Sequence, residues 1–293
     1  MTAICEKVVP GKRYPKQERT RITRWKKHDL AWRTLASLRG ADFAKYRDAR
    51  RTAGRAENTI RLELQLVSHV FEIARKEWGF ETLTNLPKNI RKPSGSRARD
   101  RRLRPGEFEV LRTKLAASSN PWAPLAFELA IETSLRQGTL FSLRWEWVKL
   151  ATRMIEFPPE ARGADNKRVP FKLPLSRRAV DVLGALAALW QRDQLADNER
   201  SQFGPVDVDP SLLSGPVFGT SCNAVVMVWK RAIKSEDCFA DLRWHDLRHE
   251  AANRLFEKGL HPLEVASITE HKSMQMLKRY THLNPADLLA KLG

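Results

Sequence analysis

The segment WHDLRHEAANRLFEKGLH, residues 244–261, holds the densest group of side chains that could do chemistry. His245 and His249 lie four residues apart, and Asp246 directly follows the first, which is close to the H-E-x-x-H pattern of zinc peptidases. However, Asp246 is one methylene shorter than the usual glutamate, and Arg248 would place a permanent positive charge beside a dication. The segment therefore fits a zinc site poorly, and we expect no metal here.

The same residues suit a phosphate group better. On a helix, His245, Arg248 and His249 would share one face. The fork of an arginine matches two phosphate oxygens and keeps its charge at neutral pH. A histidine can donate a hydrogen bond to a third oxygen or move a proton. An amphipathic helix with a buried histidine is the alternative, so the interpretation depends on residues of the same kind elsewhere.

Two further stretches supply such residues. In ETSLRQGTLFSLRWEWV, Arg136 follows an apolar helix and precedes a Gln-Gly break, where a charged side chain needs a partner or a ligand. An ion pair with Glu132, four residues earlier, is the alternative for this arginine. In ITEHKSMQMLKRYTHLNPADLLAKL, His271 and Tyr280 lie nine residues apart. For Tyr280, the alternative is an aromatic side chain at an interface.

Arg136, His245-x-x-Arg248, His271 and Tyr280, in this order, resemble the active-site signature of the tyrosine recombinases, or phage integrases. The stretches TSLRQGTLFSLRW, WHDLRH and HKSMQMLKRYTHL are similar to the local sequences of that family. Upstream, AENTIRLELQLVSHVFEIARKEWG resembles the family's core-binding domain, so the resemblance covers nearly the whole chain. Integrases of phages and plasmids, including shufflon-type invertases, are the most similar subgroup.

The resemblance implies a reaction as well as a fold. Tyr280 would attack a DNA phosphodiester and form a 3′-phosphotyrosine, with no metal or other cofactor. Arg136 and Arg248 would clamp the non-bridging oxygens, and His271 would add a hydrogen bond to the same phosphate. Because a free tyrosine has a pKa of about 10, it needs a base, and His245 is the candidate.

The family also carries a lysine on a β-hairpin, which would protonate the leaving 5′ oxygen. Lys167 in GADNKRVPFKLPLS is the best match, and Arg168 or Lys172 would take its place in a shifted register. The chain departs from the family pattern at two positions. Thr139 stands where a carboxylate often follows the first arginine, and Glu270 replaces the usual glycine before the histidine of the third motif.

The elements that must position these residues are mostly helical. We expect a mainly α fold with a small β-hairpin or sheet, in which a helical core-binding domain precedes a mixed α+β catalytic domain. Residues 1–24 are polar and basic and are interpreted as an arm, 25–92 as the helical DNA-binding domain, 93–104 as a linker, and 105–293 as the catalytic domain with a C-terminal tail helix.

Within the first domain, LAWRTLASL and ADFAKYRDARRTAG are predicted to be short helices that end at Gly40 and Gly54. The long helix over ENTIRLELQLVSHVFEIARKEWG is expected to begin at Asn58 as N-cap and to end at Gly79. Its apolar face is predicted to comprise Leu62, Leu66, Val70 and Ile73.

In the second domain, RMIEFPPEARGADNKRVPFKLPLS alternates in polarity and breaks at Gly163, as a β-hairpin does. Helices are predicted over APLAFELAIETSL and RRAVDVLGALAALWQR, and again from about Asn223 to the end. The intervening DNERSQFGPVDVDPSLLSGP is predicted to be a loop.

Charge points to a polyanionic partner. Residues 1–104 carry 27 Lys and Arg against 11 Asp and Glu, a net charge of +16, whereas residues 105–293 carry only +2. Together with the resemblance to the integrases, this charge implies double-stranded DNA at attachment sites as the partner. Five arginines fall within eight residues at the linker and are the candidate DNA contacts: Arg97, Arg99, Arg101, Arg102 and Arg104.

Composition and the resemblance set further expectations. No apolar run approaches a membrane span, no secretory signal is present, and three scattered cysteines suggest a reducing cytoplasm. Recombination of two duplexes implies a homotetramer on DNA, with the tail at 284–293 packed on a neighbouring subunit or on its own domain, and an accessory DNA-bending protein as a further partner. A catalytically weak or inactive DNA-binding protein of this fold is the main alternative; a type IB topoisomerase and a zinc peptidase follow.

Overall fold

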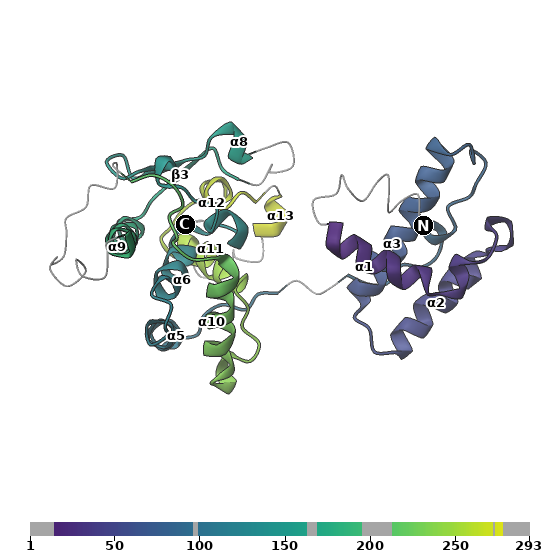
Figure 1. The fold of residues 1–293 in the computed structure, drawn as a ribbon, viewed down its shortest axis with the longest axis horizontal. Coiled ribbons are helices and arrows are strands. Elements are labelled where there is room, and N and C mark those ends of the chain that lie inside the picture. Colours follow the sequence, from purple (N-terminus) through teal and green to yellow (C-terminus); the bar gives the residue numbers. More distant parts are fainter. Residues whose placement is uncertain (1–14, 96–98, 163–168, 195–212, 272, 278–293) are drawn as a thin grey trace, which may run out of the picture. The chain divides into compact units, whose positions relative to one another are not determined.

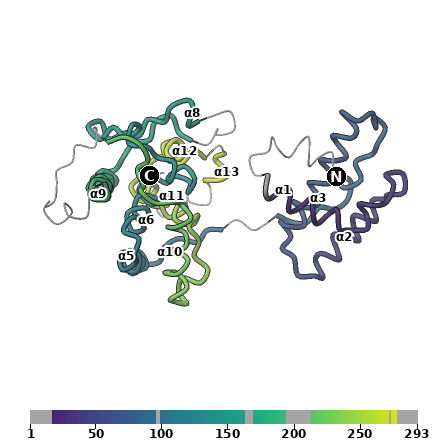
Figure 2. The backbone as a smooth tube through the Cα atoms, viewed as in Figure 1, coloured from purple at the N-terminus to yellow at the C-terminus, as the bar shows by residue number. Residues whose placement is uncertain are grey.

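The computed structural model describes residues 15–95, 99–162, 169–194, 213–271 and 273–277. The chain divides into two compact units, Met1–Ala98 and Arg99–Gly293. Figures 1 and 2 trace them from purple at the N-terminus to yellow at the C-terminus. The division falls inside the segment 93–104 that the sequence predicts as a linker, so residues 99–104 belong to the second unit.

The first unit is a small helical bundle. Its elements are α1 (Pro15–Lys26), the 3₁₀ turns η3 (Asp29–Ala31) and η4 (Leu35–Ser37), α2 (Gly40–Thr52), α3 (Glu57–Glu77) and α4 (Leu86–Asn89). Apolar residues recur every three or four positions along α3, which gives the helix one stripe to bury. The buried stripe comprises Ile60, Leu64, Val67, Phe71 and Ala74. It shares a core with Trp25 of α1 and Phe43 of α2.

The arm predicted over residues 1–24 is wrong for residues 15–24, because these form most of α1. Ile22 and Trp25 are 1% and 2% exposed, so this helix contributes two large side chains to the core of the first unit. Each such burial stabilises the fold by about 1.5–3 kcal/mol. Residues 1–14 lie outside the described part of the chain.

The ends of the helices differ from the prediction in places. LAWRTLASL forms η3 and η4 rather than one helix, and Gly40, its predicted end, begins α2. Arg33 and Arg39 donate hydrogen bonds to carbonyls within this segment, at Ser37 and Ala36. The N-cap of α3 is Ala56, so the predicted cap, Asn58, lies inside the first turn. Helices α2 and α3 end at Thr52 and Glu77, and the predicted Gly54 and Gly79 follow two residues later, with φ of 67° and 76°.

A buried carboxylate ties the three long helices of the first unit together. Glu63 of α3 is 1% exposed and accepts hydrogen bonds from Arg24 of α1 and from Tyr46 and Arg50 of α2. The Arg50 contacts are bidentate, at 3.0 and 2.9 Å. Burial opposes the charge of Glu63, but these donors outweigh it and lower the pKa of the carboxyl.

The second unit is built around α6 (Trp122–Thr133), an apolar helix that is buried on nearly every side (Figure 1). Packed against it are α5 (Glu107–Ala116), α9 (Arg177–Gln194), α10 (Cys222–Lys234) and α11 (Asp246–Glu257). Shorter elements complete the unit: α7 (Gln137–Leu140), η5 (Trp145–Trp147), α8 (Pro159–Arg162), η7 (Asp237–Phe239), α12 (Pro262–Thr269) and α13 (Met274–Leu277).

A three-stranded antiparallel sheet lies in the second unit in the order β1-β2-β3. The strands are β1 (Val148–Lys149), β2 (Met154–Glu156) and β3 (Lys172–Pro174). Ile155 pairs with Val148 on one side and with Leu173 on the other. These three side chains belong to the core of the unit. The strands β2 and β3 flank the predicted break at Gly163, which itself lies outside the described residues.

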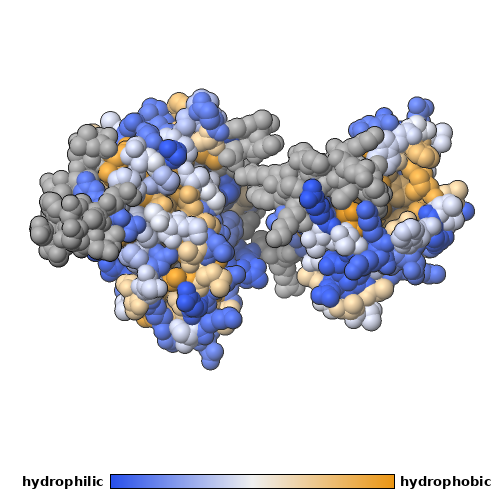
Figure 3. Space-filling model, in the orientation of Figure 1, coloured by the Kyte–Doolittle hydropathy of each residue, from blue (hydrophilic) through white to orange (hydrophobic). Residues whose placement is uncertain are grey.

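The predicted fold class is confirmed, since the protein is mainly α-helical with a small sheet. Hydrophilic side chains are spread over both units on the face drawn in Figure 3, and hydrophobic ones form smaller patches. In the part of the chain that the structure describes, no helix is both long and apolar enough to span a membrane.

Candidate active site

The start of α11 brings two of the predicted site residues together. His245 is the N-cap of this helix, and Arg248 follows in its first turn. Leu247 and Ala251, 1% and 2% exposed, anchor the helix in the interior. His245 is exposed to solvent, whereas Arg248 is only 6% exposed. A buried arginine must have partners for its donors, and these partners define the site.

Arg248 joins two corners of the chain that lie far apart in sequence. Its Nη1 donates to the carbonyl of Ser134, and its Nη2 donates to the carbonyl of Thr269. Both carbonyls lie at helix ends, where α6 and α12 stop. The next residues that could do chemistry are Arg136 and His271. One guanidinium therefore holds the two segments that carry the other predicted phosphate ligands.

Both corners turn through the left-handed region of φ. Ser134 has φ of 54° and Glu270 has φ of 53°, and each is the C-cap residue of its helix. A side chain in this conformation costs about 1–2 kcal/mol relative to the right-handed one. Glu270 is one of the two departures from the family pattern, and its φ gives a physical reason for a glycine at that position.

His271 is held by the side chain of Thr269. The Thr269 hydroxyl lies 2.5 Å from Nδ1 of His271 and donates to the carbonyl of Val265 at 2.6 Å. Because a hydroxyl has one proton, the hydrogen between Thr269 and His271 must come from Nδ1. Thr269 is fully buried, so this hydrogen bond fixes the orientation of the imidazole ring.

Arg136 lies at the N-cap of α7 and is half-buried. The alternative sequence interpretation pairs it with Glu132, whose carboxylate accepts a hydrogen bond from the Ser176 hydroxyl at 2.5 Å. The charge of Arg136 acts on His245, since it is among the causes that lower the pKa of that histidine. Arg136 is thus electrostatically coupled to the start of α11.

The environment of His245 favours its neutral form. Although the side chain reaches solvent, desolvation by the surrounding protein is the main cause that lowers its pKa below 6.5. The positive charges of Arg248 and Arg136 lower it further, and the negative charge of Asp246 opposes them. The His249 ring contacts the His245 ring edge to face, with centroids 5.5 Å apart. A neutral imidazole near neutral pH can accept a proton.

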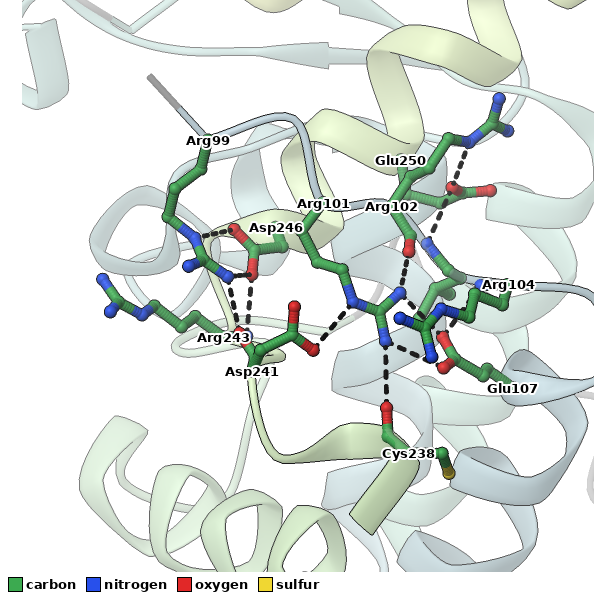
Figure 4. Close-up of polar contacts among 11 residues, drawn as sticks. Arg99, Arg101, Arg102, Arg104, Glu107, Cys238, Asp241, Arg243, Asp246 and Glu250 are labelled. Carbon is green, nitrogen blue, oxygen red and sulfur yellow. Dashed lines mark hydrogen bonds and ion pairs between the residues drawn. The ribbon is translucent and has the colours of Figure 1, made fainter. Parts of the chain in front are cut away.

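Asp246, which a zinc peptidase would use as its base, has another role. It is 1% exposed and receives a bidentate contact from Arg99, at 3.1 and 2.8 Å, together with the backbone N–H of Arg243 at 2.8 Å (Figure 4). Among the described residues, no group of three or more His, Cys, Asp or Glu is arranged to hold a metal ion.

Three of the arginines predicted to contact DNA are engaged with carboxylates of the second unit (Figure 4). Arg99 pairs with Asp246, Arg101 with Glu107, and Arg102 with Glu250. The expectation for Arg101 needs correction, because its side chain is 9% exposed and is buried in this network rather than presented to solvent. Arg104 has an exposed side chain, and Arg97 lies outside the described residues.

Two of the predicted site residues, Tyr280 and Lys167, also lie outside the described residues, as does Arg168. Of the alternatives for the hairpin lysine, Lys172 begins β3 and forms an ion pair with Glu156 of β2 at 2.6 Å. The structure thus brings together Arg136, His245, Arg248 and His271, the described members of the predicted set.

Comparison with known proteins identifies the family. A model of the phage integrase family matches residues 101–287. The chain belongs to the phage integrase family. Its sequence is 37% identical over 275 residues to the shufflon-specific DNA recombinase of Escherichia coli, an alignment that spans 91% of this chain and 64% of the recombinase.

Two solved structures share the fold of this integrase-family chain. The Tn1549 transposon integrase in complex with transposon right end DNA has a TM-score of 0.70 at 16% identity, covering 99% of this chain and 96% of the other. A lambda integrase tetramer bound to a Holliday junction has a TM-score of 0.65 at 20% identity, covering 95% and 75%. These matches confirm the predicted two-domain fold of the tyrosine recombinases.

Sequence reasoning missed the groups that position the site. Ser134 and Thr269 act through their backbone carbonyls, which carry no signal in the sequence. The partners of Asp246 and Glu250 lie about 150 residues away in the chain, at Arg99 and Arg102. The one available signal is the run of five arginines at 97–104, which the sequence analysis interprets as a DNA contact.

Proposed function

We propose that this protein is a site-specific DNA recombinase that cuts and rejoins DNA through a 3′-phosphotyrosine intermediate. The observation that carries the proposal is the arrangement around Arg248. Its guanidinium bridges the corners that precede Arg136 and His271, and His245 lies one turn away on the same helix. Integrase-family membership and the shufflon-specific relative support the reaction type.

Phosphodiester cleavage needs positive charge around the phosphate, since negative charge builds up on its oxygens as the nucleophile attacks. Arg136 and Arg248 supply two guanidinium groups for the non-bridging oxygens. Two of the five N–H donors of Arg248 are held by carbonyls, so its planar fork is oriented before DNA binds. Such preorganisation lowers the reorganisation cost when the charge develops.

His271 adds a third donor to the phosphate. Because its Nδ1 donates to Thr269, a hydrogen bond to a phosphate oxygen must use Nε2, which then carries a proton as well. We therefore propose that His271 binds the phosphate as an imidazolium ion and His245 acts as a neutral imidazole. In this proposal His271 stabilises the negative charge on the phosphate, and His245 accepts the proton.

Tyr280 is the proposed nucleophile and His245 its base. The phenol forms a bond to phosphorus, its proton passes to His245, and the bond to the 5′ oxygen breaks. Lys167 is the proposed donor of a proton to that 5′ oxygen. The 3′-phosphotyrosine preserves the phosphoester bond, so the 5′ hydroxyl of a second strand can reverse the attack without a cofactor.

The proposed partner is double-stranded DNA at attachment sites, in the cytoplasm. Phosphate contacts are supplied by the basic first unit, by the exposed Arg104, and by Arg97, which lies outside the described residues. Arg99 and Arg102 are one-third and two-fifths exposed and remain proposed contacts, in addition to their ion pairs. Phage or plasmid integration, excision and shufflon-type inversion all use this chemistry.

Strand exchange between two duplexes requires four active sites, so we propose a homotetramer on DNA, with an accessory DNA-bending protein as a further partner. The tail at 284–293 is proposed to pack on a neighbouring subunit. Deletion of 284–293 then abolishes synapsis, measured as paired DNA complexes, and retains DNA binding. Unchanged synapsis and strand exchange would remove the tail from the assembly.

Covalent trapping tests the proposed reaction. Nicked duplexes tiled across the DNA next to the gene are incubated with the protein, and adducts that survive denaturation are separated. We expect an adduct with the wild-type chain and none with Tyr280→Phe. An adduct in Tyr280→Phe would move the nucleophile elsewhere. Specific binding without any adduct would favour the alternative, a DNA-binding protein that has lost the chemistry.

A further inference from the structure

The catalytic-domain helix α11 has an acidic face behind its functional one. Asp246, Glu250 and Glu257 are spaced i, i+4 and i+11, and at about 100° per residue they fall within roughly 40° of one another around the helix axis. Arg248 projects from the opposite side, about 160–200° away. Asp246 and Glu250 are 1% and 4% exposed, so their charges need partners.

The segment 99–104 supplies the partners of this acidic face (Figure 4). Arg99 binds Asp246 through two hydrogen bonds. Arg102 reaches Glu250 at 3.2 Å and Glu257 at 2.7 Å, and the N–H of Leu103 donates to Glu250 at 3.2 Å. Each end of the helix face is therefore tied to the same short stretch of chain.

A second set of contacts anchors this stretch itself. Arg101 forms two hydrogen bonds with Glu107 at the start of α5, at 3.0 and 2.8 Å, and contacts Asp241 at 3.1 Å. The N–H of Arg104 also donates to Glu107, at 2.8 Å. The segment 99–104 is thus bound to α5 through Glu107 and to α11 through the acidic face.

We infer that the segment 99–104 is a positioning element for the active site, in which Arg99 and Arg102 hold α11 from behind and keep His245 and Arg248 oriented toward the phosphate. The inference rests on the proposed recombinase function. Arg99 is the first residue of the second unit. The chain therefore enters the second unit at a residue that binds α11. Arg99 and Arg102 act through α11, as positioning residues.

The ion pair between Arg99 and Asp246 also sets the charge beside His245. The charged groups that act on His245 are Arg248, Arg136 and Asp246, and the ring of His249 lies against it. Arg99 offsets the charge of Asp246. Removing Arg99 therefore leaves a negative charge next to His245 and raises its pKa, whereas removing the Asp246 charge lowers it.

The test is an NMR titration of the seven histidines in the full-length protein, with His245 assigned from His245→Gln. We expect Arg99→Gln and Asp246→Asn to shift the His245 midpoint in opposite directions, each by about 0.3 pH units or more. The double variant should lie between them. Arg112→Gln, which removes an arginine paired with the buried Glu128, is the matched control and should leave the midpoint unchanged. Absent shifts, or shifts of one sign, would overturn the inference.

A second measurement separates positioning from DNA contact. In the trapping assay, Arg99→Gln should slow adduct formation about tenfold at saturating DNA, in addition to any change in Kd, and Arg99→Lys should restore part of the rate. Arg102→Gln provides an independent variant if Arg99→Gln folds poorly. A loss confined to Kd, with an unchanged rate at saturating DNA, would make these arginines DNA ligands only and contradict the inference. Because the titration needs no DNA, a protein that forms no adduct would disprove the proposed function alone.

Discussion

Arg248 is the residue on which the site is centred. It is buried, and its two terminal nitrogens donate to carbonyls at the ends of α6 and α12. A lysine could keep the charge, but it lacks the planar fork that binds both carbonyls and that would also face the proposed phosphate. Arg248, which makes the zinc-like pattern in the sequence a poor metal site, is therefore the residue that joins the segments of the candidate site.

At neutral pH, His245 should be ready to accept a proton. Its pKa lies below 6.5, so the base form is lost only as the pH falls through that lowered value. We predict that the rate of adduct formation stays high at pH 6.5 and falls in an acid limb with a midpoint below 6.5, measured in single-turnover reactions. His245→Gln should be slow and should lack this limb. A midpoint above 6.5 would contradict the proposed role.

Glu270 tests the cost of a left-handed residue beside the site. It has φ of 53°, a conformation that glycine adopts freely and other residues do not. We predict that Glu270→Gly is more stable than Glu270→Ala by about 0.5–1 kcal/mol in urea unfolding, because alanine keeps the strain and glycine relieves it. Equal stabilities would show that the turn carries no strain.

At the scale of elements, the helices of the first unit depend on one carboxylate. Glu63 joins α1, α2 and α3, and its lowered pKa means that its contribution to stability is present above pH 4.5 and is lost as the pH falls through the folded-state value. We predict that Glu63→Gln destabilises the first unit by about 2–4 kcal/mol, measured by hydrogen exchange of α3 in the full chain.

The matched control for that change is Glu57→Gln on the same helix. Glu57 pairs with Arg51, and both side chains are about one-third exposed, so solvent screens the pair and the loss should be much smaller than for Glu63→Gln. Equal effects of Glu57→Gln and Glu63→Gln would show that the buried network contributes no more than a surface ion pair.

The sequence predicts these elements unevenly. Periodicity locates α3, α6 and α9, and the breaks at Gly54 and Gly79 mark helix ends, because these signals are local. The role of Glu63 was missed, since its partners come from two other helices. The arginines at 99–102 are likewise predicted to form a linker, because their acidic partners are not local. In the structure they pair with acids about 140–150 residues away in the second unit.

Within the candidate site, the sequence suggests the chemical groups but not the groups that support them. The prediction of His245 and Arg248 follows from a three-residue spacing that places both on one helix face, and that of Arg136 and His271 follows from the resemblance to the integrases. The hydroxyl of Thr269, which sets the tautomer of His271, is visible only once α12 is folded. The role of a backbone carbonyl such as that of Ser134 cannot be predicted from sequence, because every residue has one.

At the scale of the whole molecule, net charge predicts how DNA binding responds to salt. Binding of a nonspecific duplex should weaken steeply with salt, by about 10³-fold between 50 and 200 mM if about six phosphates are contacted. We predict that Arg104→Gln reduces the slope of log K against log salt by about one. Arg101→Gln should leave this slope unchanged. It should destabilise the second unit, because it removes the ion-pair partner of the buried Glu107. A change of slope in Arg101→Gln would return that residue to the DNA interface.

The central claim is that Tyr280 forms a 3′-phosphotyrosine with DNA, and mapping the adduct tests it most directly. The trapped complex is digested with trypsin and nuclease, and the modified peptide is sequenced by mass spectrometry. The account predicts a 3′-linked nucleotide on Tyr280, in the peptide that begins after Arg279 and ends at Lys291. A nucleotide on any other residue, or one linked through its 5′ phosphate, would contradict it.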